Sequence, residues 1–87
     1  MMNDLAWFLI NSDINVDEGL KLVQEALEFR PANFVYQQTK GWGLYKSGNY
    51  MEALDLLKKA WEARPVNDHG HYLLIQEVEQ AFASQNN

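Results

Sequence analysis

Two stretches of this chain have closely similar sequences. An offset of 34 aligns residues 15–33 with residues 49–67, and an offset of 35 aligns residues 7–12 with residues 42–47. The identical positions in the first alignment are Asn15/Asn49, Glu18/Glu52, Leu20/Leu54, Leu22/Leu56, Ala26/Ala60, Glu28/Glu62, Arg30/Arg64, Pro31/Pro65 and Asn33/Asn67. The change of offset places one inserted residue near Asp13–Ile14. A period near 34 with helical spacing of apolar residues is typical of helical repeats, so we expect stacked helix pairs.

Capping signals divide the chain into five predicted helices, over residues 3–11, 16–29, 34–46, 50–63 and 68–84. The residues expected to cap helix starts are Asn15, Asn33, Asn49 and Asn67. A glutamate three residues after Asn15 and after Asn49 completes a capping box. Pro31 and Pro65 end the helices before them, and Gly48 suits a left-handed helix end.

Composition predicts a single soluble domain spanning residues 1–87. The formal net charge is -5, with only seven Lys and Arg residues, which disfavours nucleic acid and anionic membranes as partners. The longest apolar run near the start, Leu5–Ile10, is too short to span a bilayer. The absence of cysteine excludes disulfides and thiolate chemistry and is compatible with a cytoplasmic location.

Small residues mark expected close approaches between paired helices. Ala6 should face Gly19, and Gly41 should face Ala53, in the two helix pairs. A glycine inside a helix costs about 1 kcal/mol relative to alanine, so its presence needs a packing reason. The sequence suggests no such reason for Gly43.

The repeated unit resembles the tetratricopeptide repeat family, in its bacterial type. The matching positions in residues 34–67 are Gly41, Leu44, Gly48, Tyr50, Ala53, Leu57, Ala60 and Pro65. The matching positions in residues 1–33 are Leu5, Ala6, Leu9, Val16, Val23, Ala26 and Pro31. Residues 68–84 resemble the helix that caps such arrays, with Ile75 in the place of Gly41. Lys40 and Gly19 depart from the pattern, which prefers a large aliphatic residue and alanine there.

The resemblance implies an all-α, right-handed superhelix with a concave groove that binds a peptide or a partner helix. The groove residues it implies are Trp7, Ile10, Asn11, Gln38, Trp42, Tyr45, Lys46, Tyr72 and Gln76. Aromatic residues with a polar group are typical of such recognition surfaces. A clamp for a terminal carboxylate is not expected, because Lys46 is the one basic residue in this set. Trp7 and Trp42 are equally compatible with a purely structural role in the core.

No pattern of catalytic residues is present, so we expect a non-catalytic protein without a cofactor. His69 and His71 are two residues apart, which places them on opposite sides of a helix and argues against a metal site.

The first predicted helix has an apolar face where a preceding repeat would normally pack. Met1, Met2 and Phe8 lie on this face. Repeat arrays need polar caps at both ends. The alternative function is therefore a structural segment of a longer array, or a homo-oligomer that uses this face.

Overall fold

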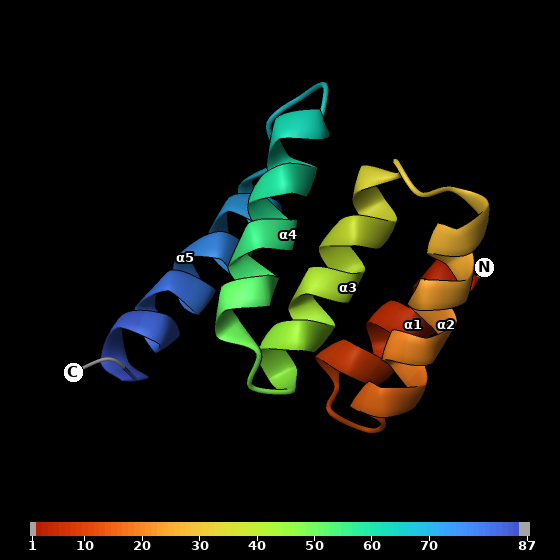
Figure 1. Ribbon diagram of the computed structural model, residues 1–87, viewed down its shortest axis with the longest axis horizontal. Coiled ribbons are helices and arrows are strands. Elements are labelled where there is room, and N and C mark those ends of the chain that lie inside the picture. The colour runs from red at the N-terminus through yellow and green to blue at the C-terminus, as the bar shows by residue number, and fades with distance from the viewer. Residues whose placement is uncertain (1, 86–87) are drawn as a thin grey trace.

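A computed structural model describes residues 2–85, and five helices account for most of them (Figure 1). These helices are α1 (Met2–Asn11), α2 (Val16–Phe29), α3 (Phe34–Lys46), α4 (Tyr50–Ala63) and α5 (His69–Gln85). No strand occurs within this part of the chain. The all-α class is confirmed, and each predicted helix end lies within one residue of the observed one.

The helices pack in the order of the chain, as α1 on α2, α2 on α3, α3 on α4 and α4 on α5 (Figure 1). Two further contacts join helices that are not consecutive, α1 with α3 and α3 with α5. The helices α2 and α4 make no such contact within residues 2–85. The domain is compact, with extents of 38 × 30 × 19 Å. One side of the molecule is therefore built from α1, α3 and α5, and we call it the odd-helix face.

Local hydrogen bonds explain where the helices begin. The side chains of Asn15 and Asn33 accept hydrogen bonds from backbone N–H groups three residues later, as predicted for N-caps. Asn49 makes no side-chain capping bond. The cap of α5 is Asp68, whose Oδ1 accepts from the His71 N–H at 2.9 Å, and not the expected Asn67. Gly48 has a φ of 89°, which confirms the left-handed helix end.

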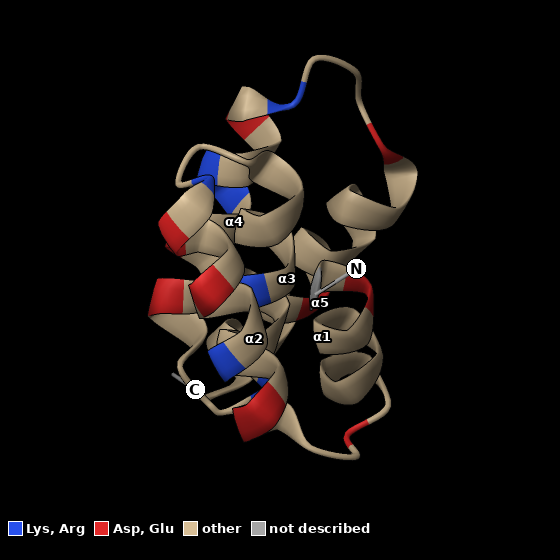
Figure 2. Ribbon diagram, turned by 90° about the vertical axis from the view of Figure 1, so that its right-hand side faces the viewer, with Lys and Arg blue, Asp and Glu red and all other residues tan. Residues whose placement is uncertain are grey.

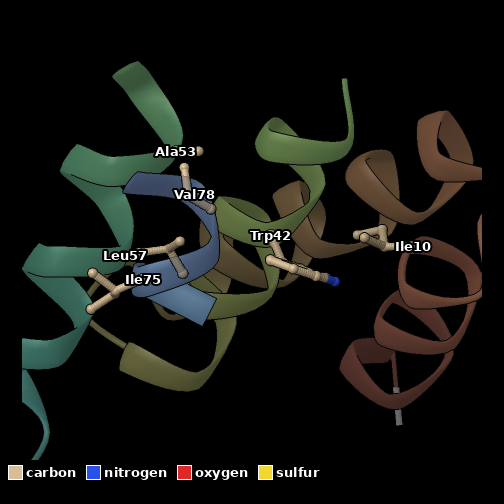
Figure 3. Packing of buried hydrophobic residues seen from close by; sticks show 6 residues of the cluster. All are labelled: Ile10, Trp42, Ala53, Leu57, Ile75 and Val78. Atoms are coloured by element: carbon tan, nitrogen blue, oxygen red, sulfur yellow. The ribbon is translucent and has the colours of Figure 1, made fainter. Parts of the chain in front are cut away.

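The buried core joins α1, α3, α4 and α5, and it includes residues that the sequence predicted to line the groove. Its buried cluster comprises Ile10, Trp42, Ala53, Leu57, Ile75 and Val78 (Figure 3). Ile10 is fully buried and Trp42 is 4% exposed. The prediction that these two side chains line an open groove is therefore wrong, because both fill space between helices. Ile75 likewise belongs to the core, because α5 packs on α3 and α4.

Two glycines allow the helices to approach one another closely. A Cβ atom added to Gly19 would lie 2.9 Å from the backbone oxygen of Ala6, which confirms the predicted pairing of α1 with α2. A Cβ atom added to Gly43 would lie 2.5 Å from Leu20 Cδ2 on α2. Gly43 thus has the packing reason that the sequence alone did not supply.

Charged residues are distributed unevenly between the two sides of the molecule. Helices α2 and α4 carry ten Asp, Glu, Lys and Arg residues, whereas α1, α3 and α5 together carry five. Figure 2 shows most of the charged ribbon on the α2 and α4 side. Within residues 2–85, no helix is both long enough and apolar enough to cross a bilayer.

Candidate partner-binding face

A ladder of aromatic rings crosses the odd-helix face and continues onto α4. The ring centroids of Trp7 and Trp42 are 6.5 Å apart, those of Trp42 and Tyr45 are 4.8 Å apart, and those of Tyr45 and Tyr50 are 5.5 Å apart. Trp7 and Tyr45 are partly exposed, whereas Trp42 lies beneath them. The structure therefore brings together three of the four predicted groove aromatics, with one of them buried.

Asn11 presents a free hydrogen-bond donor beside this ladder. Trp42 Nε1–H donates to Asn11 Oδ1 over 3.1 Å. An indole nitrogen can only donate, so the amide oxygen of Asn11 must face it. The NH₂ group of this exposed asparagine consequently points away from the ring and is available to an acceptor.

Gln38 is oriented in a similar way, but by a charged donor. Its Oε1 accepts a hydrogen bond of 2.7 Å from the guanidinium of Arg64, which can only donate. Arg64 also lies over the ring of Phe34, with its Cζ 4.8 Å from the ring centroid. The Gln38 NH₂ group is thus a second donor whose direction is determined by the protein.

Lys46 is held against the aromatic ladder by two contacts. Its Nζ is 3.0 Å from Asp13 Oδ2 and 5.6 Å from the centroid of the Trp42 ring. Asp13 has a positive φ of 60° in the turn where the extra residue was predicted. The insertion therefore supplies the carboxylate that pairs with Lys46.

Glu77 is a residue of this face that the sequence did not indicate. Tyr45 donates its hydroxyl to Glu77 Oε2 over 2.9 Å, which joins α3 to α5. Partial burial, together with this hydrogen bond and the nearby negative charge, raises the pKa of Tyr45. The family resemblance implied Gln76, and not Glu77, as a groove residue, so this contact is seen only in the orientation of α5 in the structure.

Tyr72 and Gln76 form a separate cluster at the start of α5. Gln76 Nε2 donates to the Tyr72 hydroxyl over 2.9 Å, and the Tyr72 ring packs against His69 and Trp61. These ring and hydrogen-bond contacts join α5 to α4 and do not reach the ladder around Trp42. The predicted groove residues are therefore divided into two groups.

His71 lies on the side of α5 that faces α4, and it is fully buried there. Its burial fixes how α5 is rotated about its own axis. Its Nε2 lies 2.9 Å from the Leu57 carbonyl oxygen, and its Nδ1 accepts a 3.2 Å hydrogen bond from Arg64 Nε. The ring stands edge-on to Trp61. Only the neutral tautomer with hydrogen on Nε2 satisfies both partners. Burial, assisted by the positive charge of Arg64, lowers the pKa of His71.

The two histidines do not share a site. His71 is enclosed, whereas His69 is exposed at the helix start. Between residues 2 and 85, no group of three or more His, Asp or Glu side chains is arranged to hold a metal ion.

The apolar face of α1 is open to solvent. Phe8 is 55% exposed and Leu5 is 51% exposed. The equivalent residues of the second repeat, Gly43 and Lys40, lie against α2. Of the other residues predicted for self-association, Met1 and the side chain of Met2 lie outside the described part of the structure. The surface that a preceding helix would cover is therefore uncovered at Phe8.

Three open cavities lie away from the predicted groove residues. One of about 280 Å³ lies between α3 and α4, one of about 240 Å³ adjoins the turn between them, and one of about 330 Å³ lies beside the turn between α2 and α3. None of the three is lined by a residue of the predicted groove. These three cavities therefore lie apart from Trp7, Trp42 and Tyr45 of the aromatic ladder.

Comparison with known proteins identifies no relative of this chain. No protein-family model, no curated protein and no solved structure gives a significant match.

Proposed function

We propose that this chain is a non-catalytic interaction module of tetratricopeptide type, whose odd-helix face binds a peptide segment or a helix of another protein. The observation that carries the proposal is the pair of amide groups, on Asn11 and Gln38, that the protein orients with their NH₂ donors free. Such donors suit the carbonyl groups of a bound polypeptide, and the adjacent rings suit its apolar side chains.

The arrangement of the helices supports this proposal. In a superhelix of paired helices, the first members of the pairs meet along the inner side. Here α1 contacts α3 and α3 contacts α5, whereas α2 and α4 stay apart. The charge-rich helices α2 and α4 would then form the solvated outer side.

The test is selection of peptides on the immobilised protein, followed by fluorescence anisotropy with the selected sequences. Tyr72→Ala, which removes a 45% exposed ring from the odd-helix face, should weaken binding about tenfold. The matched control is Phe29→Ala, which removes an 85% exposed ring at the end of α2 and should leave binding unchanged. Trp42→Ala is unsuitable, because it removes core packing. Equal effects of the two variants would contradict the proposal.

A second candidate function is self-association or array extension through the apolar face of α1. It is favoured by the exposure of Leu5 and Phe8 at positions whose equivalents are covered in the second repeat. Sedimentation at several protein concentrations tests it. Phe8→Glu should shift an oligomer to monomer and Phe29→Glu should not. A wild-type protein that stays monomeric at all concentrations would remove the self-association version.

A further inference from the structure

In the two ion pairs that adjoin α3, the carboxylate is the more exposed member. The side chain of Lys46 is 20% exposed and that of its partner Asp13 is 64% exposed. The side chain of Arg64 is 15% exposed and that of Asp68 is 50% exposed. A molecule approaching either pair therefore meets its negative end first.

The two cations are covered because each lies over an aromatic ring. Lys46 Nζ is 5.6 Å from the Trp42 centroid, and Arg64 Cζ is 4.8 Å from the Phe34 centroid. Arg64 additionally donates to Gln38 and His71. These internal contacts occupy the directions in which the cations would otherwise bind an incoming anion.

Two further carboxylates increase the negative charge of the odd-helix face. Asp4 is exposed on α1, and its spacing to Trp7 and Asn11 places it on the same side of that helix. Glu77 is exposed on α5 and is held toward α3 by the Tyr45 hydroxyl. Lys40, the remaining lysine of α3, donates to Gln24 on α2 and does not neutralise them.

We propose that the odd-helix face selects basic polypeptide segments, with carboxylates binding Lys or Arg side chains while the Asn11 and Gln38 amides bind backbone carbonyl groups. This inference rests on the proposed function and adds the chemistry of the partner. It is argued from charge complementarity, because four carboxylates and two covered cations leave the face negative.

The positions of the exposed carboxylates suggest the spacing of the partner's cations. Asp13 and Asp68 belong to ion pairs at opposite ends of α3, since Lys46 ends that helix and Phe34 begins it. Twelve helical steps separate these ends, which corresponds to about 18 Å. An extended peptide covers this distance in about five residues.

The experiment measures anisotropy of three labelled peptides that are identical except at two positions about five residues apart. These positions carry Arg in the first peptide, Gln in the second and Glu in the third. We expect the order of affinity Arg over Gln over Glu, with the Arg peptide weakening as salt increases. Asp4→Asn and Glu77→Gln should each weaken the Arg peptide about two- to fivefold. Glu77→Gln retains an oxygen for the Tyr45 hydroxyl.

The control is Glu25→Gln, which removes the same charge from an exposed position on α2 and should leave affinity unchanged. Equal binding of the three peptides, preference for the Glu peptide, or equal effects of Glu77→Gln and Glu25→Gln would overturn the inference. If binding in those cases is still weakened by Tyr72→Ala and not by Phe29→Ala, the proposed function is kept and the preference for basic segments is rejected. Failure of selected and designed peptides alike to bind would remove the proposed function, and this inference with it.

Discussion

The buried imidazole of His71 should make the stability of this domain depend on pH in a defined range. In the folded protein, Nδ1 accepts from Arg64 and Nε2 donates to the Leu57 carbonyl, so an added proton would face the guanidinium without an acceptor. The charged groups that face the ring are Arg64 at the end of α4 and Asp68 at the start of α5. Burial is the largest cause of the lowered His71 pKa; the Leu57 hydrogen bond raises this pKa, Arg64 lowers it and Asp68 raises it, and the net direction is down.

The direction of the pH effect follows from the lowered pKa. The unfolded chain has a histidine pKa near 6.5, so below this pH it binds a proton that the folded protein does not. The part of the stability that depends on a neutral His71 is fully present above pH 6.5. It is lost as the pH falls toward the folded-state pKa. The loss is at most about 1.4 kcal/mol per pH unit for one proton. Between pH 6.5 and 5, the free energy of unfolding should therefore fall by no more than about 2 kcal/mol, or about 16 °C in melting temperature.

The assay is urea unfolding followed by circular dichroism at a series of pH values. His71→Gln keeps a side-chain N–H that can reach the Leu57 carbonyl but cannot titrate, and it should flatten the profile over this range. His69→Gln, at an exposed position on the same helix, is the matched control and should retain the slope. Asp68 lies outside this window, because the His71 backbone N–H and Arg64 lower the pKa of its carboxyl group. An unchanged slope in His71→Gln, or a flat profile in the wild type, would refute the reasoning.

Substitutions at three further positions should have distinct effects on the free energy of unfolding, measured by urea denaturation. Gly19→Ala should destabilise the domain by about 1 to 3 kcal/mol, although alanine has the better helix propensity, because the new Cβ would meet the rigid backbone oxygen of Ala6. A stabilised variant would refute this contact. Asn11→Ala should lower the free energy of unfolding by about 1 kcal/mol or more, because it leaves the Trp42 N–H without an acceptor. Asn11→Asp keeps the accepting oxygen and should recover most of this loss. Equal losses in the two variants would contradict the role of Oδ1. Lys58→Ala should change stability by less than about 0.5 kcal/mol, because its ion pair with α5 is exposed, and a larger loss would show unexpected coupling.

Much of the fold could be predicted from the sequence because its signals are local. Asn15 and Asn33 cap the helices that their spacing indicates, and Gly48 takes the conformation that glycine favours. These features depend on a few neighbouring residues. The reason for Gly43 could not be obtained in this way, because it depends on Leu20 of another helix.

The candidate site was predicted less well than the fold, because it depends on how α5 is rotated about its own axis. The repeat pattern relates α1 to α3 correctly, so Asn11, Trp42 and Lys46 meet as neighbours. In contrast, the orientation of α5 depends on its packing against α3 and α4. This packing buries Ile75 and His71.

The same rotation accounts for the acidic character of the odd-helix face. With Ile75 and Val78 in the core, Glu77 is the residue of α5 that reaches Tyr45. The buried His71 meanwhile engages Arg64, which keeps that cation covered and leaves Asp68 at the surface. The packing of α5 therefore adds the Glu77 carboxylate to the odd-helix face and keeps the Arg64 cation covered. Under the proposed function, the orientation of α5 would therefore affect partner selectivity as much as the residues of α1 and α3 do.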